Sequence, residues 1–387
     1  MAFAAAAALL ALALGGIDGT AVALQASGRT ETSALAFSGG GGGTRGLAAL
    51  DVLPRLGLLL DRKTLRLALA YEPQLRASQA LSYAAGDVAL VHGGSARAEW
   101  DLHPLWRATG TARSSVRILD FVAAGAGDLG RLLDLRRAPS VFRYRDDGAT
   151  AAIEGRPTPL VTVGSTASVA WSGGAGAFGA AAVPWMREAR VAGSVARAQT
   201  RRDVLRLEAA GAAAAFELGE PASLATVSAE WSRQVRRALR LRLVGSASEA
   251  RDRTSGGRLL GGGEAGLEAT PALLGRPLAL SASLRAGPAF DRFVARVQER
   301  AGADAAATWA VTPRWSVGAS AAYARVRERL GYAAGRGAVR GEWKATRRLV
   351  AYADAWHEQR RDPAALAGGS ASYLGVSVGV ILAPVAR

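Results

Sequence analysis

The sequence predicts an all-β fold, a transmembrane antiparallel β-barrel of about 16–18 strands, and three observations lead to it. First, apolar and polar residues alternate with a period of two, as where Leu239, Leu241 and Leu243 alternate with Arg240 and Arg242. Second, the alternating segments run for about ten to fourteen residues, enough for the roughly nine to eleven that a tilted strand needs to cross a bilayer. Third, short and long connections alternate between these segments, as in transmembrane barrels.

Each alternating segment is expected to form one strand, because successive side chains of a strand point to opposite faces. The expected strands are 28–38, 46–60, 63–77, 88–101, 105–117, 158–171, 175–183, 187–199, 204–217, 221–232, 238–250, 257–270, 277–287, 292–310, 315–327, 334–344, 348–359 and 370–383. Short turns are expected at 61–63, 103–105, 200–203, 234–236, 273–276, 312–314 and 345–347. The alternation is weakest in 28–38 and 175–183, which leaves sixteen strands as an alternative.

Composition excludes several classes of protein. The 387 residues include no Cys, so disulfide scaffolds and thiolate metal sites are excluded. The formal net charge is +16, and nearly all the basic residues are Arg. These arginines are spread singly along the chain, without a basic arm or cluster, so we do not expect nucleic acid as a partner.

The first residues resemble a secretory leader. An apolar run covers 2–14, and the small residues 21–23 offer a cleavage site. We therefore expect a signal peptide over residues 1–23 and a barrel over 24–387. No basic residue precedes the apolar run, and a buried Ala-rich helix is the alternative.

Tryptophan recurs around the predicted short turns. Tyr and Trp favour the membrane–water interface, because one end of the ring is apolar and the other forms hydrogen bonds. We expect a periplasmic aromatic girdle made of Trp100, Trp106, Trp171, Trp231, Trp309, Trp315 and Trp343. Trp as core filler in a soluble β-sandwich is the alternative.

The polar face of the strands is rich in arginine, which a dry core would not tolerate. That face is therefore expected to line a wet lumen, and the apolar face to contact lipid. Lumen-lining candidates are Arg66, Arg76, Arg240, Arg242, Arg336 and Arg340. Their charge would favour anions; alternatively, they pair with acids across strands and stiffen the wall.

The longest predicted connection covers 118–157. Its part around Phe121, Leu129, Leu132 and Leu133 has helical spacing. A connection of this length can fold into a barrel as a constriction or stay outside as a solvated extracellular loop.

The last strand resembles the carboxy-terminal signal that the β-barrel assembly machinery reads. Tyr373, Gly375, Val378 and Val380 fit the spacing of that signal, although the chain does not end in an aromatic residue. Together with the YxPxL pattern of 71–75 and the TPRW turn of 312–315, the chain resembles outer-membrane β-barrel proteins of GC-rich Gram-negative bacteria, including porin-like and polysaccharide-export barrels. The resemblance implies an outer-membrane location, with lipid, lipopolysaccharide and the assembly machinery as partners.

No catalytic site is expected. Of the three histidines, only His357 has acids nearby, Asp354 and Glu358, and nothing in the sequence places a nucleophile beside it. No two histidines have metal-binding spacing. We therefore expect neither an enzyme nor a metal or other cofactor.

Three functions remain open from the sequence. The first is an Arg-lined, anion-preferring diffusion pore. The second is a barrel partner of a polysaccharide export system. The third is a structural or surface-display barrel that conducts nothing.

Overall fold

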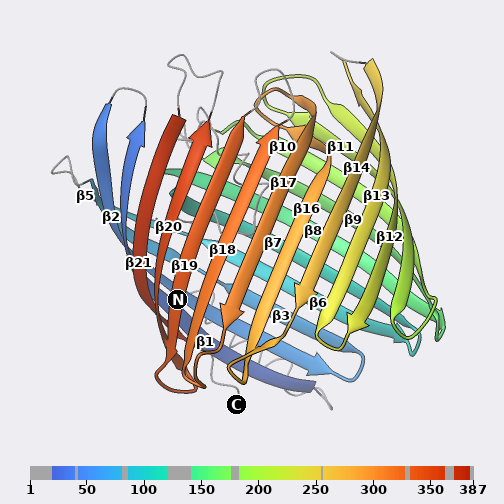
Figure 1. Ribbon diagram of the computed structural model, residues 1–387, viewed down its shortest axis with the longest axis horizontal. Coiled ribbons are helices and arrows are strands. Elements are labelled where there is room, and N and C mark those ends of the chain that lie inside the picture. The colour runs from blue at the N-terminus through green and yellow to red at the C-terminus, as the bar shows by residue number, and fades with distance from the viewer. Residues whose placement is uncertain are drawn as a thin grey trace.

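The computed structural model describes residues 20–39, 42–80, 86–120, 141–175, 183–253, 256–326, 332–361 and 370–383. These residues form one continuous antiparallel sheet (Figure 1). Its segments are β1 (Thr20–Gly39), β2 (Gly42–Arg62), β3 (Leu65–Tyr71), β4 (Gln74–Ala80), β5 (Gly86–Val91), β6 (Gly93–His103), β7 (Trp106–Asp120), β8 (Val141–Thr158), β9 (Val161–Ala175), β10 (Met186–Ala198), β11 (Asp203–Phe216), β12 (Ala222–Arg236), β13 (Leu239–Asp252), β14 (Gly256–Ala269), β15 (Ala272–Leu273), β16 (Arg276–Asp291), β17 (Arg296–Trp309), β18 (Trp315–Val326), β19 (Ala333–Lys344), β20 (Leu349–Arg361) and β21 (Ser370–Leu382).

The sheet closes on itself, because β1 pairs with β2 on one side and with β21 on the other. Closure satisfies the backbone groups that an open sheet would leave unpaired at its edges, which a strand surrounded by lipid requires. The predicted closed antiparallel barrel is confirmed.

The wall contains eighteen strands. β3 and β4 both pair with β2, on either side of Pro73, and form one interrupted strand. β5 and β6 form another, interrupted at His92. β15 is a two-residue segment that pairs with β16 at a turn. The twenty-one segments therefore give eighteen wall strands when each interrupted strand is counted once and β15 is left out.

Short and long connections lie at opposite ends of the barrel. The seven predicted short turns all lie at one end, here named the short-turn end; Thr20 of β1 and Leu382 of β21 lie there too, level with Arg62 and Leu349. The opposite end, where β7 connects to β8 and β20 to β21, is named the long-connection end. In Figure 1 the strands run obliquely, as the wall of a closed barrel requires.

Two errors in the predicted strands cancel in the count. β8 occupies 141–157 of the segment expected to be the connection 118–157, and β7 extends to Asp120, so that β7 and β8 are joined by 121–140 alone. Charges on both faces of β8, at Arg145, Asp146 and Asp147, hide its alternation. Conversely, β9 pairs directly with β10, so the predicted segment 175–183 forms no wall strand between them.

Some predictions concern residues outside the described ranges. Residues 121–140, which contain the predicted helical pattern, are among them, and so are residues 1–19. β1 begins at Thr20, inside the segment predicted as the leader. The signal peptide stays a prediction.

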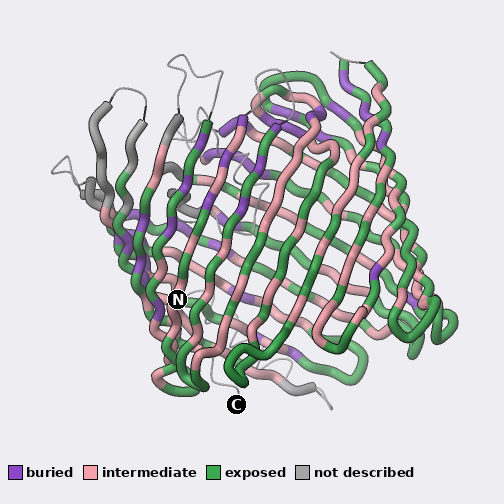
Figure 2. Tube along the Cα trace, in the orientation of Figure 1, coloured by how far each residue is buried: buried purple, intermediate pink, exposed green. Residues whose placement is uncertain are grey.

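Among the described residues, burial is concentrated near the long-connection end, and elsewhere most residues of the wall are exposed or half-buried (Figure 2). One buried cluster contains Ala324, Val326 and Tyr332, and a second contains Phe216 and Phe290. In the described part of the chain, no helix is long and apolar enough to cross a membrane.

Candidate functional site: the inner face of the barrel

The hairpin of β16 and β17 leaves the wall near the long-connection end. β16 pairs with β14 as far as Ala286, and β17 pairs with β18 from Arg300 onward. Past these residues the two strands continue to pair with each other, up to Asp291 and Arg296. Pro288 lies just beyond the last pair with β14, where its missing N–H interrupts no ladder to that neighbour.

The tip of this hairpin contacts distant strands. Arg292 donates hydrogen bonds to the carbonyl oxygen of Ser172 at 3.1 Å and to its hydroxyl at 3.0 Å. Ser172 belongs to β9, and β10 to β14 lie between β9 and β16 in the wall. Phe290 packs in a buried cluster with Phe216 of β11, their ring centroids 6.4 Å apart. Contacts with both β9 and β11 place the tip inside the barrel.

The hairpin therefore identifies the inner face of the wall. Phe216, which it touches, shares a face of β11 with Arg206 and Glu208, by the alternation of the strand. Leu205 and Leu207 lie on the opposite face, where Leu207 is 54% exposed. The charged face thus lines the lumen, and the apolar face is directed outward.

The connection 118–157 was predicted either to form a constriction or to stay outside as a solvated loop, and its remaining part, 121–140, lies outside the described residues. The element that enters the lumen in the described chain is the β16–β17 hairpin. Its segments were predicted as ordinary strands, 277–287 and 292–310. Pro288, between them, was the one available signal, because proline disfavours continued pairing in a wall strand.

The six predicted arginines lie on strands whose charged face is the inner one, and most of them are paired. Arg66 lies 3.4 Å from Asp61, and Arg242 lies within 3.0 Å of Glu230 and 2.7 Å of Glu264. These pairs match the alternative of a charge-paired wall.

The remaining members of the set differ in exposure. Arg76, 3.7 Å from Asp51, has a side chain only 3% exposed. Arg336 lies 3.9 Å from Glu358, and Arg340 lies 2.8 Å from Glu342. Arg240 is exposed near the short-turn end and has no ion pair with any residue that the structure describes. Buried arginines such as Arg76 are not available to a passing solute.

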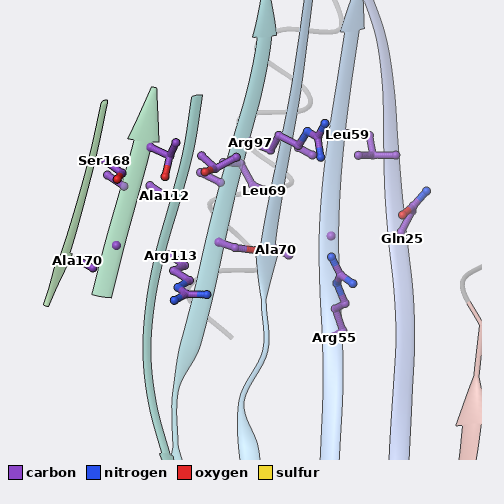
Figure 3. A pocket seen from close by; sticks show the side chains of 18 of the residues that line it. Gln25, Arg55, Leu59, Leu69, Ala70, Arg97, Ala112, Arg113, Ser168 and Ala170 are labelled. Carbon is purple, nitrogen blue, oxygen red and sulfur yellow. The ribbon is translucent and has the colours of Figure 1, made fainter. Parts of the chain in front are cut away.

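A groove of about 660 Å³ runs along the inner face of β1, β2, β3, β6, β7, β8 and β9. Arg55, Arg97 and Arg113 project from β2, β6 and β7 into this region (Figure 3). Hydroxyl groups add to its lining, from Ser27, Ser95, Thr111, Thr150 and Ser168. None of the described lining residues is an acid. Alternation places Arg97 and Arg113 on the polar face of their strands, but no pattern in the sequence shows which inward arginines share one groove.

Each of the three groove arginines has one carboxylate partner and remains exposed to the lumen. Arg55 lies 3.1 Å from Glu72, and its side chain is 58% exposed. Arg97 lies 2.7 Å from Glu99 and Arg113 2.9 Å from Asp146, with exposures of 64% and 57%. Each guanidinium carries five N–H donors, so a single carboxylate leaves several donors for another ligand.

The seven predicted girdle tryptophans all lie on the outer face, but not at one end. Six are near short turns: Trp100, Trp106, Trp231, Trp309, Trp315 and Trp343. Trp315 and Trp343 stack with centroids 6.0 Å apart, and Trp309 donates to the carbonyl oxygen of Leu273 at 3.3 Å. Trp171 was wrongly assigned to this end. It lies near the long-connection end of β9, because the missed strand β8 reverses the direction expected there.

The residues of the predicted assembly signal divide between the two faces of β21. Val378 and Val380 are exposed on the outer face. Tyr373 and Gly375 are on the inner face, where Tyr373 lies beneath the guanidinium of Arg360 at 5.3 Å. A Cβ at Gly375 would lie 2.3 Å from the ring of Trp356, so this glycine makes room for an inner tryptophan. Recognition by the assembly machinery stays a prediction.

The histidines form no catalytic or metal site within the described ranges. His357 Nε2 lies 2.9 Å from Ser372 Oγ on the outer face, but Asp354 and Glu358 project to the inner face. No described carboxylate bonds to the other ring nitrogen of His357. No group of three or more potential metal ligands occurs among the described residues.

These features define the class of protein. A closed antiparallel barrel of eighteen strands, apolar outside and charged inside, is a porin-like barrel of the bacterial outer membrane, and barrels of this size enclose an aqueous channel. In such barrels the short turns face the periplasm, so we expect the long-connection end to be extracellular.

Solved structures share this fold. The crystal structure of Pseudomonas aeruginosa OpdO has 11% sequence identity and a TM-score of 0.53, and the match covers 93% of this chain and 97% of that one. P. aeruginosa OpdQ has 8% sequence identity and a TM-score of 0.52, and the match covers 94% of this chain and 99% of that one. P. aeruginosa OpdK with vanillate has 9% sequence identity and a TM-score of 0.52, and the match covers 93% of this chain and 98% of that one. These proteins are outer-membrane porins, which are not enzymes. No family model and no curated protein sequence matches the chain.

Proposed function

We propose that the chain is a pore for small anionic solutes, which move along the groove of Arg55, Arg97 and Arg113. The composition of the groove carries this proposal. Three exposed guanidiniums and five hydroxyl groups line it, and its described lining contains no carboxylate. The partner acids Glu72, Glu99 and Asp146 are not part of this lining, so an anion in the groove contacts guanidinium donors.

The solute class is a small carboxylate. Arginine binds carboxylates through two parallel hydrogen bonds, and hydroxyl groups complete the coordination of such a ligand. The similar barrel OpdK was crystallised with vanillate, which is a small aromatic carboxylate. The shared fold makes the same chemistry a reasonable substrate class here.

Planar-bilayer recordings of the refolded protein under a KCl gradient test the proposal. The reversal potential is expected to show anion preference, and Arg97→Gln with Arg113→Gln should lower the anion-to-cation permeability ratio by roughly twofold. Arg197→Gln, on the outer face of β10, is the matched control and should leave the ratio unchanged.

A second measurement concerns the substrate class. Vanillate added to one side should reduce the KCl current of the wild-type pore at concentrations at which uncharged vanillin has no effect. A cation-selective wild-type pore, or equal block by the acid and the aldehyde, would overturn the proposal.

A further inference from the structure

A row of side chains crosses the outer face of β8, β9 and β10 at one level. Asp147 pairs in register with Trp171, and Trp171 pairs with Arg187. Trp171 lies ten residues beyond Val161, where β9 leaves its short turn. With a rise of about 3.3 Å per residue and a tilt of about 40°, ten residues climb about 25 Å, the height of the apolar band of such barrels. The row therefore lies at the outer edge of that band, where lipid headgroups begin.

The row is built around a tryptophan with two arginines on it. The guanidinium carbon of Arg187 is 4.3 Å from the centroid of the Trp171 ring, and that of Arg145 is 5.6 Å from it. Trp185 packs beside Trp171 with ring centroids 5.2 Å apart. It lies over Gly173, where a Cβ would approach it to 2.9 Å. The cluster of Arg145, Trp171, Trp185 and Arg187 is thus packed in place and is named the outer-rim cluster.

The two arginines of the outer-rim cluster differ in their partners. Arg145 donates to Asp147 at 2.7 Å. Arg187 is exposed and forms no ion pair with any described residue. Stacking on the ring holds a guanidinium by its face and leaves the N–H groups at its edge free to donate. Arg187 is therefore a fixed cation whose donors are available to an anion at headgroup depth.

An apolar groove of about 610 Å³ adjoins the cluster on the outer face. The groove is lined at one edge by Asp147, Trp171 and Arg187 of the row. Its other outward side chains on the strands are small, and they belong to Ala149, Val169, Ala189, Ala213 and Ala215. Ala149, Val169, Ala189 and Ala213 are in register with one another, two residues from the row of Trp171 toward the short-turn end. Outward positions elsewhere on the wall carry leucines, whose side chains are larger. The row of small residues therefore forms a trough in the outer face. In a membrane, hydrocarbon chains fill such a trough.

We propose that the outer-rim cluster and its trough bind lipopolysaccharide of the outer leaflet. Arg187, assisted by Arg145, binds a phosphate of the lipid A headgroup, and one acyl chain lies in the trough. Charge complementarity selects this occupant, because the ligand must carry a phosphate at headgroup depth and hydrocarbon directly below it. Arginine forms paired hydrogen bonds with phosphate, and the indole rings pack against the sugar-bearing interface. This site is separate from the lumen and does not depend on which solute passes.

Native mass spectrometry of the refolded, detergent-solubilised barrel with purified lipid A tests the proposal. We expect one tightly bound lipid A, and a Kd about tenfold weaker for Arg187→Gln. Arg197→Gln changes an outward arginine of the same strand at its short-turn end, and its Kd should match the wild type. Arg187→Lys keeps the charge but not the planar fork, so it should bind with intermediate affinity.

The probes distinguish the parts of the ligand. Lipid A from which both phosphates have been removed should bind the wild-type barrel as weakly as intact lipid A binds Arg187→Gln, because the contact between Arg187 and the phosphate is lost in both cases. Ala213→Phe fills the trough and should weaken lipid A binding without affecting the conductance of the pore. Phosphatidylglycerol, a phosphate lipid with a smaller headgroup, should bind more weakly than lipid A.

Three outcomes would overturn the assignment. Equal affinity of Arg187→Gln and Arg197→Gln would mean that Arg187 holds no headgroup. Equal binding of lipid A and phosphatidylglycerol would make the site one for anionic lipid in general. An unchanged Kd for lipid A in Ala213→Phe would mean that no acyl chain lies in the trough. Each variant is compared at equal folded fraction, measured by the shift of the unheated barrel on a gel.

Discussion

Arg292, at the tip of the β16–β17 hairpin, donates two hydrogen bonds to Ser172, 120 positions earlier in the chain. Arg292 is buried, with 2% of the residue exposed, and its guanidinium also lies 6.0 Å from the ring centroid of Tyr144 on β8. This contact fastens the hairpin across the lumen, because β8 and β9 lie on a part of the wall that β16 does not adjoin. The hairpin is therefore a structural determinant of the free cross-section of the pore.

Removing the contact should enlarge the pore. Arg292→Ala removes both hydrogen bonds to Ser172, so the tip is expected to move more freely and the mean single-channel conductance to rise, with more frequent current fluctuations. Arg253→Ala is the matched control, since Arg253 pairs with Glu220 at the same end of the barrel without touching the hairpin. An unchanged conductance in Arg292→Ala would mean that the hydrophobic cluster alone holds the tip.

A second contact of the hairpin tip depends on a glycine. A Cβ at Gly219 would lie 2.3 Å from Cβ of Ala295, and Gly219 has φ of +140°. Gly219→Ala should therefore displace the tip and raise the conductance. Gly256→Ala separates displacement from backbone strain, because Gly256 also has a positive φ, +62°, but has no atom within 4 Å of an added Cβ. If both variants change the conductance equally, strain in the loops, not the collision, is responsible.

The fold was predictable from the sequence because a wall strand repeats one simple pattern. Leu239, Leu241 and Leu243 against Arg240 and Arg242 specify a strand, its length and its two faces, whatever its neighbours are. β8 was not predicted as a strand because charges occupy both of its faces near the long-connection end. The number of strands was right only because this omission offset the surplus segment 175–183.

The contents of the lumen were much less predictable, because they depend on contacts between residues far apart in the sequence. Ordinary alternation continues through Phe290 and Val297 even though the hairpin there has left the wall. Similarly, Arg76 and Arg97 have the same local pattern, yet one is buried beside Asp51 and the other lines the groove. Alternation gives the face of a residue but not its height in the barrel or what covers it.

Gly375 has a packing role that can be separated from recognition by an assembly machinery. Its added Cβ would lie 2.3 Å from ring atoms of Trp356, which is 3% exposed. Gly375→Ala should lower the free energy of unfolding in urea, measured in lipid vesicles, by about 1–3 kcal/mol. Gly341→Ala, on β19, which pairs with β20, and with no atom within 4 Å of an added Cβ, should change it little.

A compensating variant completes that test. Trp356→Leu combined with Gly375→Ala should recover much of the loss, because the two changes share one contact and are not additive. Normal folding of Gly375→Ala in vesicles, combined with failed assembly in cells, would contradict the packing role and support recognition of Gly375 by the assembly machinery.

Selectivity that arises from the groove should depend on ionic strength. The guanidiniums of Arg55, Arg97 and Arg113 are more than half exposed, so mobile ions screen them. The Debye length falls from about 10 Å at 0.1 M salt to about 3 Å at 1 M. The anion-to-cation permeability ratio, from reversal potentials at a fixed concentration ratio, should therefore approach unity as the mean KCl concentration rises through this range. A ratio independent of salt would contradict selection by long-range charge and indicate that ions are selected by direct contact at a narrow point. The Arg292→Ala variant distinguishes the two cases. Loss of the contact between the hairpin and Ser172 would widen the narrow point and abolish selection of ions by direct contact there. It would leave the electrostatic field of the groove arginines in place.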